Sequence, residues 1–499
     1  MSIFYASPTG TSGNAGTLGS PWSLAHVATG AGGAVGAGDT VLFLDGTYTI
    51  NPAAHLAVTT GGTVNAPVEW RSLNPYGATL NGPISLNGNN FLLRDFRITW
   101  LHDTIRTTNN PGSTPVDVPR AQVGANLVLG DNVTVAECWM YDGAGGLFSN
   151  NGADNFRAID NIVWNNGWTG PDRGHGHGFY CQNNGTTRHR LRGNIAFCNG
   201  SSGIKIGGTS GSLLLRFDVW DNAAFNNQLS GVVVRGFSLE SAFQHDGGTN
   251  NKGDTTVLRN FFVQQHQPSA FSFEIGDNNP GDFPVTITDN VIVGRTLLNE
   301  WPSLTFRRNV LTDAPALADI NVPVGLLRVN NSVAYDIDAN TYATRQTDSP
   351  FGRALILAAT GRTITEWRNL SPYDDNTTFI DGALPSPRVR VVPSTYTIGK
   401  GHIYALNPQG AASVSVDLGP ILSGLTGFPY AIYHVYDYVT GGSPTVEGIY
   451  NGNLVTLPMT SKTPPTPFGG VPLPTQDNTF GCFVVTQRPG WNVTYRRGI

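Results

Sequence analysis

The fold is decided by a phrase that recurs between residues 155 and 309, in which one Asn precedes a run of apolar side chains. It reads Asp160-Asn161-Ile162-Val163-Trp164, Gly193-Asn194-Ile195-Ala196-Phe197, Asp221-Asn222-Ala223-Ala224-Phe225, Arg259-Asn260-Phe261-Phe262-Val263, Asp289-Asn290-Val291-Ile292-Val293 and Arg308-Asn309-Val310-Leu311. Successive Asn residues are 33, 28, 38, 30 and 19 positions apart. Three short strands joined by three turns need roughly 24 residues. The spacing therefore indicates a solenoid whose coils carry loops of different length.

A second phrase follows the first in phase and has the alternation of a strand. Its copies are Gly178-Phe179-Tyr180-Cys181-Gln182, Gly203-Ile204-Lys205-Ile206-Gly207, Gly231-Val232-Val233-Val234-Arg235 and Ala270-Phe271-Ser272-Phe273-Glu274. Strand side chains alternate between faces, so the second and fourth positions should point inward, and they are apolar in every copy. Stacked apolar side chains beside stacked Asn amides are typical of a parallel β-helix.

Composition excludes several classes of partner. The 499 residues include 61 Gly, only 13% are charged, and the net charge is −5, so no nucleic acid is expected as a partner. No apolar run approaches the roughly 18 residues of a membrane span, and Met1 to Tyr5 lack the basic and apolar regions of a signal peptide. The four cysteines have no metal-binding spacing, and Cys181 is expected to be a small buried hydrophobe.

The N-terminal segment carries a more specific set of phrases. Ser20-Pro21-Trp22 is followed by the strand Gly38-Asp39-Thr40-Val41-Leu42-Phe43 and then by Gly46-Thr47-Tyr48. In this order they resemble the opening of pectate-lyase-like right-handed parallel β-helix proteins, which include polysaccharide lyases, hydrolases and phage tailspikes. The resemblance covers roughly residues 1 to 345 and implies an N-terminal cap followed by a right-handed parallel β-helix.

Beyond the coils the rhythm of the sequence changes. Residues 346–390 read as a connecting segment, and residues 391–499 as a separate domain of short alternating strands, such as His402-Ile403-Tyr404-Ala405-Leu406 and Cys482-Phe483-Val484-Val485. Regular strands at this spacing predict a C-terminal β-sandwich. The fold class expected for the whole chain is therefore all-β, a right-handed parallel β-helix followed by a C-terminal β-sandwich.

The outward positions of the second phrase hold the candidate site. They are Tyr180 and Gln182, Lys205, Val233 and Arg235, and Ser272 and Glu274. Because neighbouring coils lie about 4.8 Å apart, they would form a column about 15 Å long, the reach of an extended oligosaccharide. Two segments would wall it: a loop with Asp172, Arg173, His175 and His177, and an insertion over 237–254 with Phe237, Phe243 and His245.

This column is predicted to bind a polysaccharide and to cleave it by one of two reactions. In β-elimination on a uronic acid, Lys205 or Tyr180 would be the base, Arg235 would neutralise the carboxylate, and His177 or Tyr180 would protonate the leaving oxygen. Hydrolysis needs two carboxylates, and the column holds only Glu274, with Asp142, Asp172 and Asp246 as candidate partners from loops. Elimination is therefore slightly favoured. The third interpretation is that Lys205 and Arg235 are solvated residues without a function.

The loop phrase Gly176-His177-Gly178 resembles the Gly-His-Gly of polygalacturonases, and Gly203-Ile204-Lys205 resembles their Arg-Ile-Lys. The paired aspartates of that family are absent one coil earlier, where the chain reads Phe148-Ser149-Asn150-Asn151-Gly152, and this departure argues against pectin hydrolysis. His175 and His177 lack an evident third metal ligand. We therefore predict no metal site and no cofactor, with Ca²⁺ kept open.

The competing function is that of a virion protein without catalysis. Phage tailspikes and fibres are similar β-helices, often trimeric, and begin at a plain Met because lysis releases them. The expected partners are thus a polysaccharide and, as an alternative, a homotrimer or a virion assembly, with no membrane partner. The expected location is extracellular or on a virion.

Overall fold

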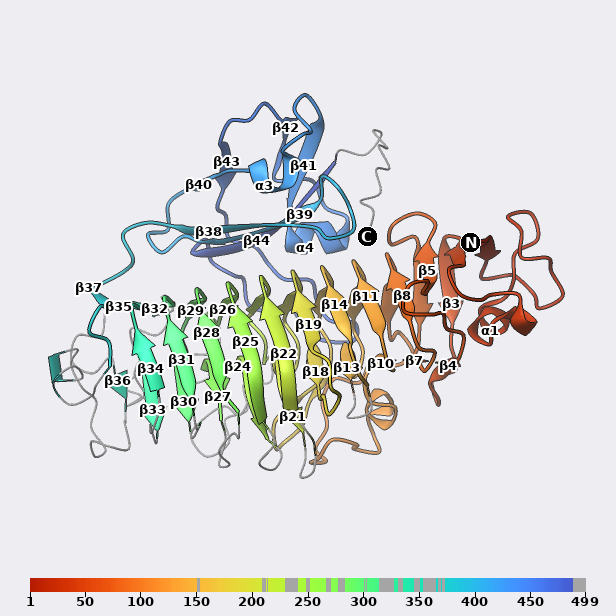
Figure 1. Cartoon of the computed structure of the whole chain (residues 1–499), viewed down its shortest axis with the longest axis horizontal. Coiled ribbons are helices and arrows are strands. Elements are labelled where there is room, and N and C mark those ends of the chain that lie inside the picture. The colour runs from red at the N-terminus through yellow and green to blue at the C-terminus, as the bar shows by residue number, and fades with distance from the viewer. Residues whose placement is uncertain are drawn as a thin grey trace.

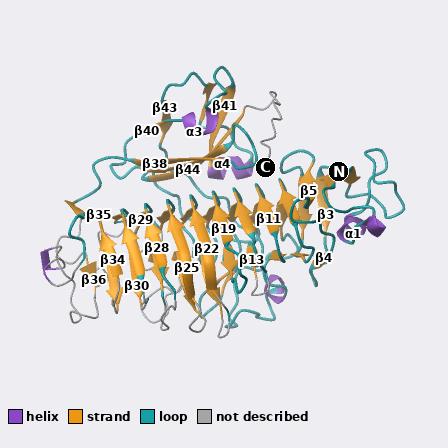
Figure 2. Ribbon diagram, viewed as in Figure 1, coloured by secondary structure: helices purple, strands orange, loops and turns teal. Residues whose placement is uncertain are grey.

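The computed structural model describes residues 1–149, 153–208, 212, 214–228, 241–247, 252–265, 271–276, 283–299, 301, 303–313, 327–330, 335–344, 351–352, 365–366, 369 and 373–487. Within these residues three long parallel sheets run side by side along one axis, and a second domain lies against the side of the resulting prism (Figure 1). Strands are far more abundant than helices, which are short and few among the described residues (Figure 2). The predicted right-handed parallel β-helix with a C-terminal β-sandwich is confirmed.

Each coil passes from the first sheet to the third and then to the second. The first sheet consists of β1 (Ile3–Ala6), β2 (Thr40–Phe43), β5 (Val68–Ser72), β8 (Phe91–Arg94), β11 (Val133–Ala136), β14 (Arg157–Ile159), β19 (His189–Arg192), β22 (Leu214–Trp220), β25 (Lys252–Leu258), β28 (Val285–Thr288), β31 (Leu304–Arg307) and β34 (Tyr335–Asp338). The second consists of β4 (Leu56–Val58), β7 (Ile84–Leu86), β10 (Leu127–Leu129), β13 (Leu147–Ser149), β18 (Phe179–Cys181), β21 (Ile204–Gly208), β24 (Ser241–Gly247), β27 (Phe271–Ile275), β30 (Arg295–Asn299), β33 (Leu327–Asn330) and β36 (Phe351–Gly352). The third consists of β3 (Gly46–Thr49), β6 (Ala78–Asn81), β9 (Arg97–Thr99), β12 (Trp139–Tyr141), β15 (Ile162–Trp164), β20 (Ile195–Phe197), β23 (Ala223–Phe225), β26 (Phe261–Val263), β29 (Val291–Val293), β32 (Val310–Thr312), β35 (Thr341–Thr344) and β37 (Thr378–Asp381).

The N-terminal end of the prism is closed by a short helical cap. Helix α1 (Leu24–Ala28) begins at Ser23, whose side chain accepts a hydrogen bond from the backbone N–H of His26, and the 3₁₀ helix η1 (Ala31–Gly33) follows. Val27 and Ala28 of this cap are buried in the main core. At the other end, β36 and β37 come from the segment predicted as a connection, and both pair with strands of the coils.

Alternation within the strands builds the core of the prism as the sequence predicts. Phe179, Ile204, Phe243 and Phe273 pair in register from coil to coil, and all are fully buried. Cys181 is also fully buried, and burial raises the pKa of its thiol to about 12. It is an inert core residue rather than a nucleophile.

One strand assignment from the sequence is wrong. The strand that pairs with both β21 and β27 is β24, and not the stretch 231–235. Residues 229–240, with Val232, Val234, Arg235 and Phe237, lie outside the described residues. The Val-rich stretch is a stronger strand signal than Ala242-Phe243-Gln244-His245, which is why the pattern alone selected it.

The recurring Asn residues stack at one corner of the coils. The Oδ1 atom of Asn194 accepts from both the backbone N–H and the Nδ2 of Asn161, at 3.0 Å each, and the same pair of bonds repeats from coil to coil as far as Asn340. The ladder runs through Asn161, Asn194, Asn222, Asn260, Asn290, Asn309 and Asn340, all buried. Each Nδ2 also donates to a carbonyl of the preceding coil, as Asn222 does to Leu191 at 2.9 Å. The predicted stacking of the Asn phrases is confirmed.

A second, shorter ladder that the sequence analysis missed lies at the next corner. Asn199 Oδ1 accepts from the backbone N–H and Nδ2 of Asn166, and Asn227 Oδ1 accepts from those of Asn199. Asn166, Asn199 and Asn227 each lie two residues beyond the end of a third-sheet strand, β15, β20 and β23 respectively. This ladder therefore ties together the three chain segments that leave the third sheet.

We expect Asn222→Ala to lower the free energy of unfolding by at least about 2 kcal/mol, because it leaves the buried N–H of Asn194 and the carbonyl of Leu191 unpaired. Chemical denaturation followed by circular dichroism measures this change. The matched control is Asn184→Ala, at an exposed Asn, for which a change within about 0.5 kcal/mol is expected. Equal stability of the two variants would contradict the role of the ladder.

The C-terminal domain is an antiparallel sandwich. One layer consists of β38 (Arg388–Pro393), β39 (Gly401–Leu406), β44 (Phe480–Gln487), β41 (Pro429–His434) and β42 (Val446–Ile449), and the other of β40 (Ser413–Val416) and β43 (Val455–Pro458). Helix α3 (Gly419–Leu422) lies in the connection from β40 to β41, between the layers, and α4 (Val435–Thr440) lies between β41 and β42 of the larger layer. Between the layers lies a core that includes Ile403, Ile432 and Leu457.

The larger layer of the sandwich also packs on the outer face of the third sheet. Phe197, Phe225 and Phe261 from the coils share one buried cluster with Tyr404 and Phe480 from the sandwich. The Pro-rich loop that follows β43 reaches further along the coils, where the carbonyl of Pro465 accepts from Asn165. The sandwich is therefore fixed along the side of the β-helix.

A buried ion pair adds to this interface. Lys400 Nζ lies 3.3 Å from Glu137 Oε1 and donates to Tyr76 at 2.7 Å. Burial opposes the charge of Lys400, yet the carboxylate of Glu137 holds the pKa of this ammonium well above its usual range. Removing one partner would leave a buried charge without compensation.

Asp160 is a buried carboxyl close to Lys400 and Glu137, and its pKa is raised. Burial raises its pKa to about 7, although the backbone N–H of Thr395 donates to its Oδ2 at 2.8 Å. Between about pH 4 and pH 7 the folded chain binds a proton here that the unfolded chain does not bind. The contribution of Asp160 to the free energy of unfolding is therefore complete below about pH 4 and is lost as the pH rises towards 7.

We expect Asp160→Asn to stabilise the protein by about 1–4 kcal/mol at pH 8 and to have little effect near pH 4, because the amide stays neutral and still accepts from Thr395. Thermal melts of both proteins across this range measure the difference. Asp375→Asn, at an exposed carboxylate, should show no such pH dependence. A stabilisation by Asp160→Asn that is equal at pH 4 and pH 8 would contradict the raised pKa.

Candidate functional site

The register of the second sheet brings the main candidates into one column on its outer face. Tyr180 pairs with Lys205, Lys205 with Gln244, and Gln244 with Glu274. Phe148 of β13 extends the column one coil towards the N-terminus. Tyr180 and Lys205 are half-buried between fully buried neighbours, as outward positions of a covered core should be. The structure therefore brings Tyr180, Lys205 and Glu274 together as predicted.

Gln244 takes the place that the sequence analysis gave to Val233. Ser202 donates from Oγ to Gln244 Oε1 at 3.1 Å, and Gln244 Nε2 donates to Glu274 Oε2 at 3.3 Å. Ser241 donates to the same carboxylate oxygen at 2.9 Å. Glu274 is only 9% exposed, so this chain of bonds holds its carboxylate in a fixed place on the column.

His177 lies at the start of β18 and next to the column. Its ring centroid is 5.0 Å from that of Tyr180, which in turn is 5.3 Å from that of Phe148. The Nδ1 atom of His177 lies 3.2 Å from the backbone N of Ser202 and 2.9 Å from the Oγ of Ser201. A backbone N–H can only donate, so Nδ1 is the acceptor and the neutral ring carries its proton on Nε2. His177 is therefore set to donate a hydrogen bond from Nε2.

A hairpin of β16 (Trp168–Thr169) and β17 (Gly174–His175) precedes His177. His175 is 5% exposed and stacks on Trp168, with 4.9 Å between the ring centroids. Its Nε2 lies 3.2 Å from Asp172 Oδ1. Partial burial opposes the charge of Asp172, but hydrogen bonds from His175 and from the backbone of Gly112 lower the pKa of its carboxyl.

These contacts settle which of the loop residues can reach a ligand. His175 is packed within the hairpin and positions Asp172, so it does not face outward as predicted for a sugar-binding residue. Asp172 and Arg173 lie at the exposed tip, where Arg173 donates to Ser113 at 2.9 Å. Gln182 follows β18, and its backbone N–H bonds to Ser149 at the neighbouring coil.

The predicted sugar contact of His245 is wrong. Its side chain is fully buried, packs against Trp301 at 5.0 Å between ring centroids and lies 3.2 Å from the hydroxyl of Thr255. Phe243 is likewise in the main core. Both belong to β24, a strand of the coil, so residues 237–254 are not a simple surface insertion.

The candidate second carboxylates for hydrolysis do not gather at the column. Asp142 pairs with Arg106 and accepts from the backbone of Phe468, at the end of a strand in the third sheet. Asp172 bonds to the hairpin, and the backbone of Asp246 lies opposite Gly207, one strand position beyond His245. Glu274 is thus the carboxylate that the described residues place in the column with defined partners.

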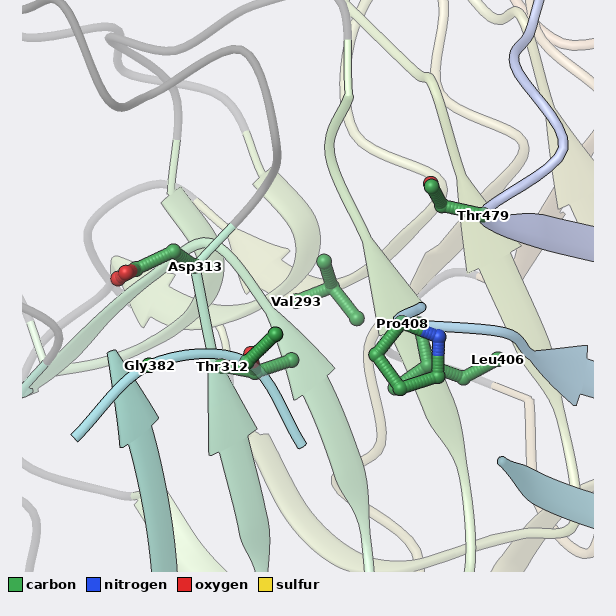
Figure 3. Close-up of a pocket in the computed structure, with 8 residues that line it drawn as sticks. Val293, Thr312, Asp313, Gly382, Leu406, Pro408 and Thr479 are labelled. Atoms are coloured by element: carbon green, nitrogen blue, oxygen red, sulfur yellow. The ribbon is translucent and has the colours of Figure 1, made fainter. Parts of the chain in front are cut away.

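No group of three or more His, Cys, Asp or Glu side chains in the described part of the chain is arranged to hold a metal ion. A pocket between the third sheet and the sandwich, lined by Val293, Thr312 and Leu406 among others, has a volume of about 20 Å³ (Figure 3). That is room for a single water and not for a sugar. Over the described residues, no helix has the length and apolar character to cross a bilayer.

Gln244, Ser202 and Phe148 are candidate site residues that the sequence analysis missed. Phe148 had a usable signal, because Leu147-Phe148-Ser149 alternates like the later strands and immediately precedes them by one coil. Gln244 could not be found without the register, since the better strand pattern at 231–235 competed with it. Ser201 and Ser202 carry no pattern that distinguishes them from ordinary turn residues.

Comparison with known proteins concerns the fold. No family model and no curated protein matches the chain. Similar solved structures include a rhamnogalacturonan lyase (15% identity, TM-score 0.44, covering 72% of this chain and 86% of that one) and the A-module of mannuronan C-5 epimerase AlgE4 from Azotobacter vinelandii (13%, 0.45, 72% and 88%). A pectate lyase, Pel9A, is 15% identical with a TM-score of 0.40, covering 79% of this chain and 91% of that one.

The predicted resemblance to pectate-lyase-like right-handed parallel β-helix proteins is confirmed in fold. The strand pairing of the three sheets carries that conclusion by itself. Chemistry at the column must be argued from its own residues.

Proposed function

We propose that the protein binds an acidic polysaccharide along the column Phe148–Tyr180–Lys205–Gln244–Glu274 and cleaves it by β-elimination. The observation that carries this proposal is the register, which places an aromatic pair, a lysine, an amide and a carboxylate on successive coils. Coils about 4.8 Å apart place the half-buried Tyr180 and Lys205 at consecutive points along an extended chain, with the buried Gln244 and Glu274 on the next two coils. Phe148 and Tyr180 offer ring faces against which a pyranose can pack.

The reaction needs a base, an acid and a hydrogen-bond donor for the carboxylate of the uronate. Lys205, acting in its neutral form, takes the proton from the carbon next to that carboxylate. The released electron pair forms the new carbon–carbon double bond, and the bond to the leaving oxygen breaks. The hydroxyl of Tyr180 gives its proton to that oxygen and is reprotonated from solvent, while Lys205 returns its proton to solvent.

His177 completes this arrangement through its tautomer. With Nδ1 accepting from Ser202, the Nε2–H donates to a carboxylate oxygen of the substrate, where negative charge increases in the transition state. Glu274 holds Gln244 through the bond at 3.3 Å and fixes the far end of the column. Arg235, predicted to neutralise the uronate, lies outside the described residues.

Elimination is favoured over hydrolysis because of the number of carboxylates with defined places. Hydrolysis needs an acid and a base or nucleophile on either side of the bond, and Glu274 is the carboxylate that the column supplies. A substrate of this kind is a polymer of cell surfaces or matrices. The proposed function therefore implies a protein that acts outside cells or on a virion.

We expect Lys205→Ala and Tyr180→Phe each to reduce kcat/KM on a uronate polymer by a factor of roughly 10²–10⁴, with nearly unchanged melting temperature, because both residues are half-buried on the outer face. The assay records absorbance near 235 nm, where unsaturated uronates absorb, over a panel of uronate-containing and neutral polysaccharides. Lys462→Ala, in the C-terminal domain, is the matched lysine control and should retain full activity.

Each other outcome of this assay points to a different function. New reducing ends without absorbance near 235 nm would show hydrolysis instead of elimination. Full activity of the Lys205→Ala, Tyr180→Phe double variant would remove the catalytic assignment. Binding without any cleavage across the panel would favour the non-catalytic, receptor-binding alternative.

A further inference from the structure

A cleft lies on a different face of the β-helix from the column. It runs between the outer face of the first sheet, at β5, β8 and β14, and the sandwich segment 395–400, and its volume is about 1540 Å³. Small-molecule pockets usually measure about 300–1,000 Å³, so this space can hold several sugar units.

The cleft is lined by three arginines, and in the described residues only one of them is paired with carboxylates. Arg71 and Arg94 are in-register partners on adjacent strands, and Arg157 lies two strands further along the sheet. Arg94 is held by Asp95 at 3.0 Å and by Glu137 at 3.6 Å. In the described part of the chain, Arg71 has no ion pair, and the Nε of Arg157 is buried without a hydrogen-bond partner. In the described residues no carboxylate pairs with Arg71 or Arg157, so both guanidinium groups that line the cleft can pair with an anionic ligand.

The other charges in the cleft are already engaged. Glu69 accepts from the hydroxyl of Thr40 at 3.2 Å, and Lys400 is paired with Glu137 below the surface. Asp95 accepts from Arg94. The cationic groups left to meet a ligand are therefore Arg71 and Arg157, in a chain whose net charge is −5.

The wall of the cleft adds an aromatic surface. Tyr396 from the sandwich packs on the small apolar cluster of Leu92, Ala136 and Ile159. The guanidinium of Arg94 lies 5.7 Å from the centre of its ring. An aromatic ring beside cations is a surface that suits an acidic sugar better than a small inorganic ion.

We propose that this cleft is a second binding site for an oligosaccharide that carries repeated carboxylates, separate from the column and without a catalytic role. Arg71 and Arg157 are about 14 Å apart along the sheet, three strand spacings of about 4.8 Å, so one anion cannot bridge them but a chain with repeated charges can. The choice of a uronate rests on the proposed function. The site itself rests on the cleft and its arginines.

The test uses the Lys205→Ala protein, so that the ligand stays intact. Hexamers of galacturonate and of mannuronate, maltohexaose and inorganic phosphate are titrated by calorimetry, and hydrogen exchange records which backbone segments become protected. We expect one of the uronate hexamers to protect residues 66–76 and 394–400. Arg71→Gln with Arg157→Gln should raise the Kd of this site at least about tenfold and abolish that protection.

Arg190→Gln is the matched control, because Arg190 pairs in register with Arg157 but lies outside the cleft. It should bind as the parent does. Protection of residues 66–76 and 394–400 that survives the double substitution would overturn the proposal. Equal protection by maltohexaose or by phosphate would also overturn it, as would no protection by either uronate hexamer.

The same data separate this inference from the proposed function. Protection of the column strands 179–181 and 204–208 reports the column, and it should persist in the Arg71→Gln, Arg157→Gln protein. Protection at the cleft without protection at the column would remove the column assignment and leave the cleft. Protection at the column without protection at the cleft would overturn the cleft proposal and leave the column assignment.

Discussion

The structure depends on buried amide groups that are satisfied only when the coils stack. An Asn inside the main ladder accepts from the backbone and amide of the preceding Asn, and it donates to a backbone carbonyl of the preceding coil and to the side-chain oxygen of the next Asn. Asn222 does so with Asn194, Leu191 and Asn260. An isolated coil would bury these groups unpaired, at a cost that its own short strands could not offset. The ladder therefore ties each coil to the next and sets their rotation about the axis.

That constraint also places the site. With the coils stacked in register, Tyr180, Lys205, Gln244 and Glu274 of the second sheet fall in line, although up to 94 residues separate them in the sequence. The sandwich stiffens the same frame from the opposite side through Glu137, Lys400 and the aromatic cluster of the third sheet. The arginine-lined cleft lies between the sandwich and the outer face of the first sheet.

Sequence alone predicts the fold well, because Asn161 and the Asn residues that recur after it make the same hydrogen bonds from coil to coil. It predicts the column in part. Tyr180 and Lys205 follow from alternation, but Gln244 does not, since choosing between 231–235 and 241–247 requires knowing which stretch pairs with β21. His245 shows the same limit. Its stretch of sequence resembles a loop, so its ring was predicted to contact a sugar, but the register of β24 places the side chain in the interior. The cleft is beyond sequence reasoning, because it forms only where two domains meet.

The most direct measurement is a crystal structure of the Lys205→Ala protein with a uronate oligosaccharide that it binds in solution. The account predicts a sugar chain along the outer face of the second sheet, with one ring against Phe148 and Tyr180 and a carboxylate oxygen within hydrogen-bond distance of the Nε2 of His177. A ligand bound elsewhere while this face stays empty would contradict it.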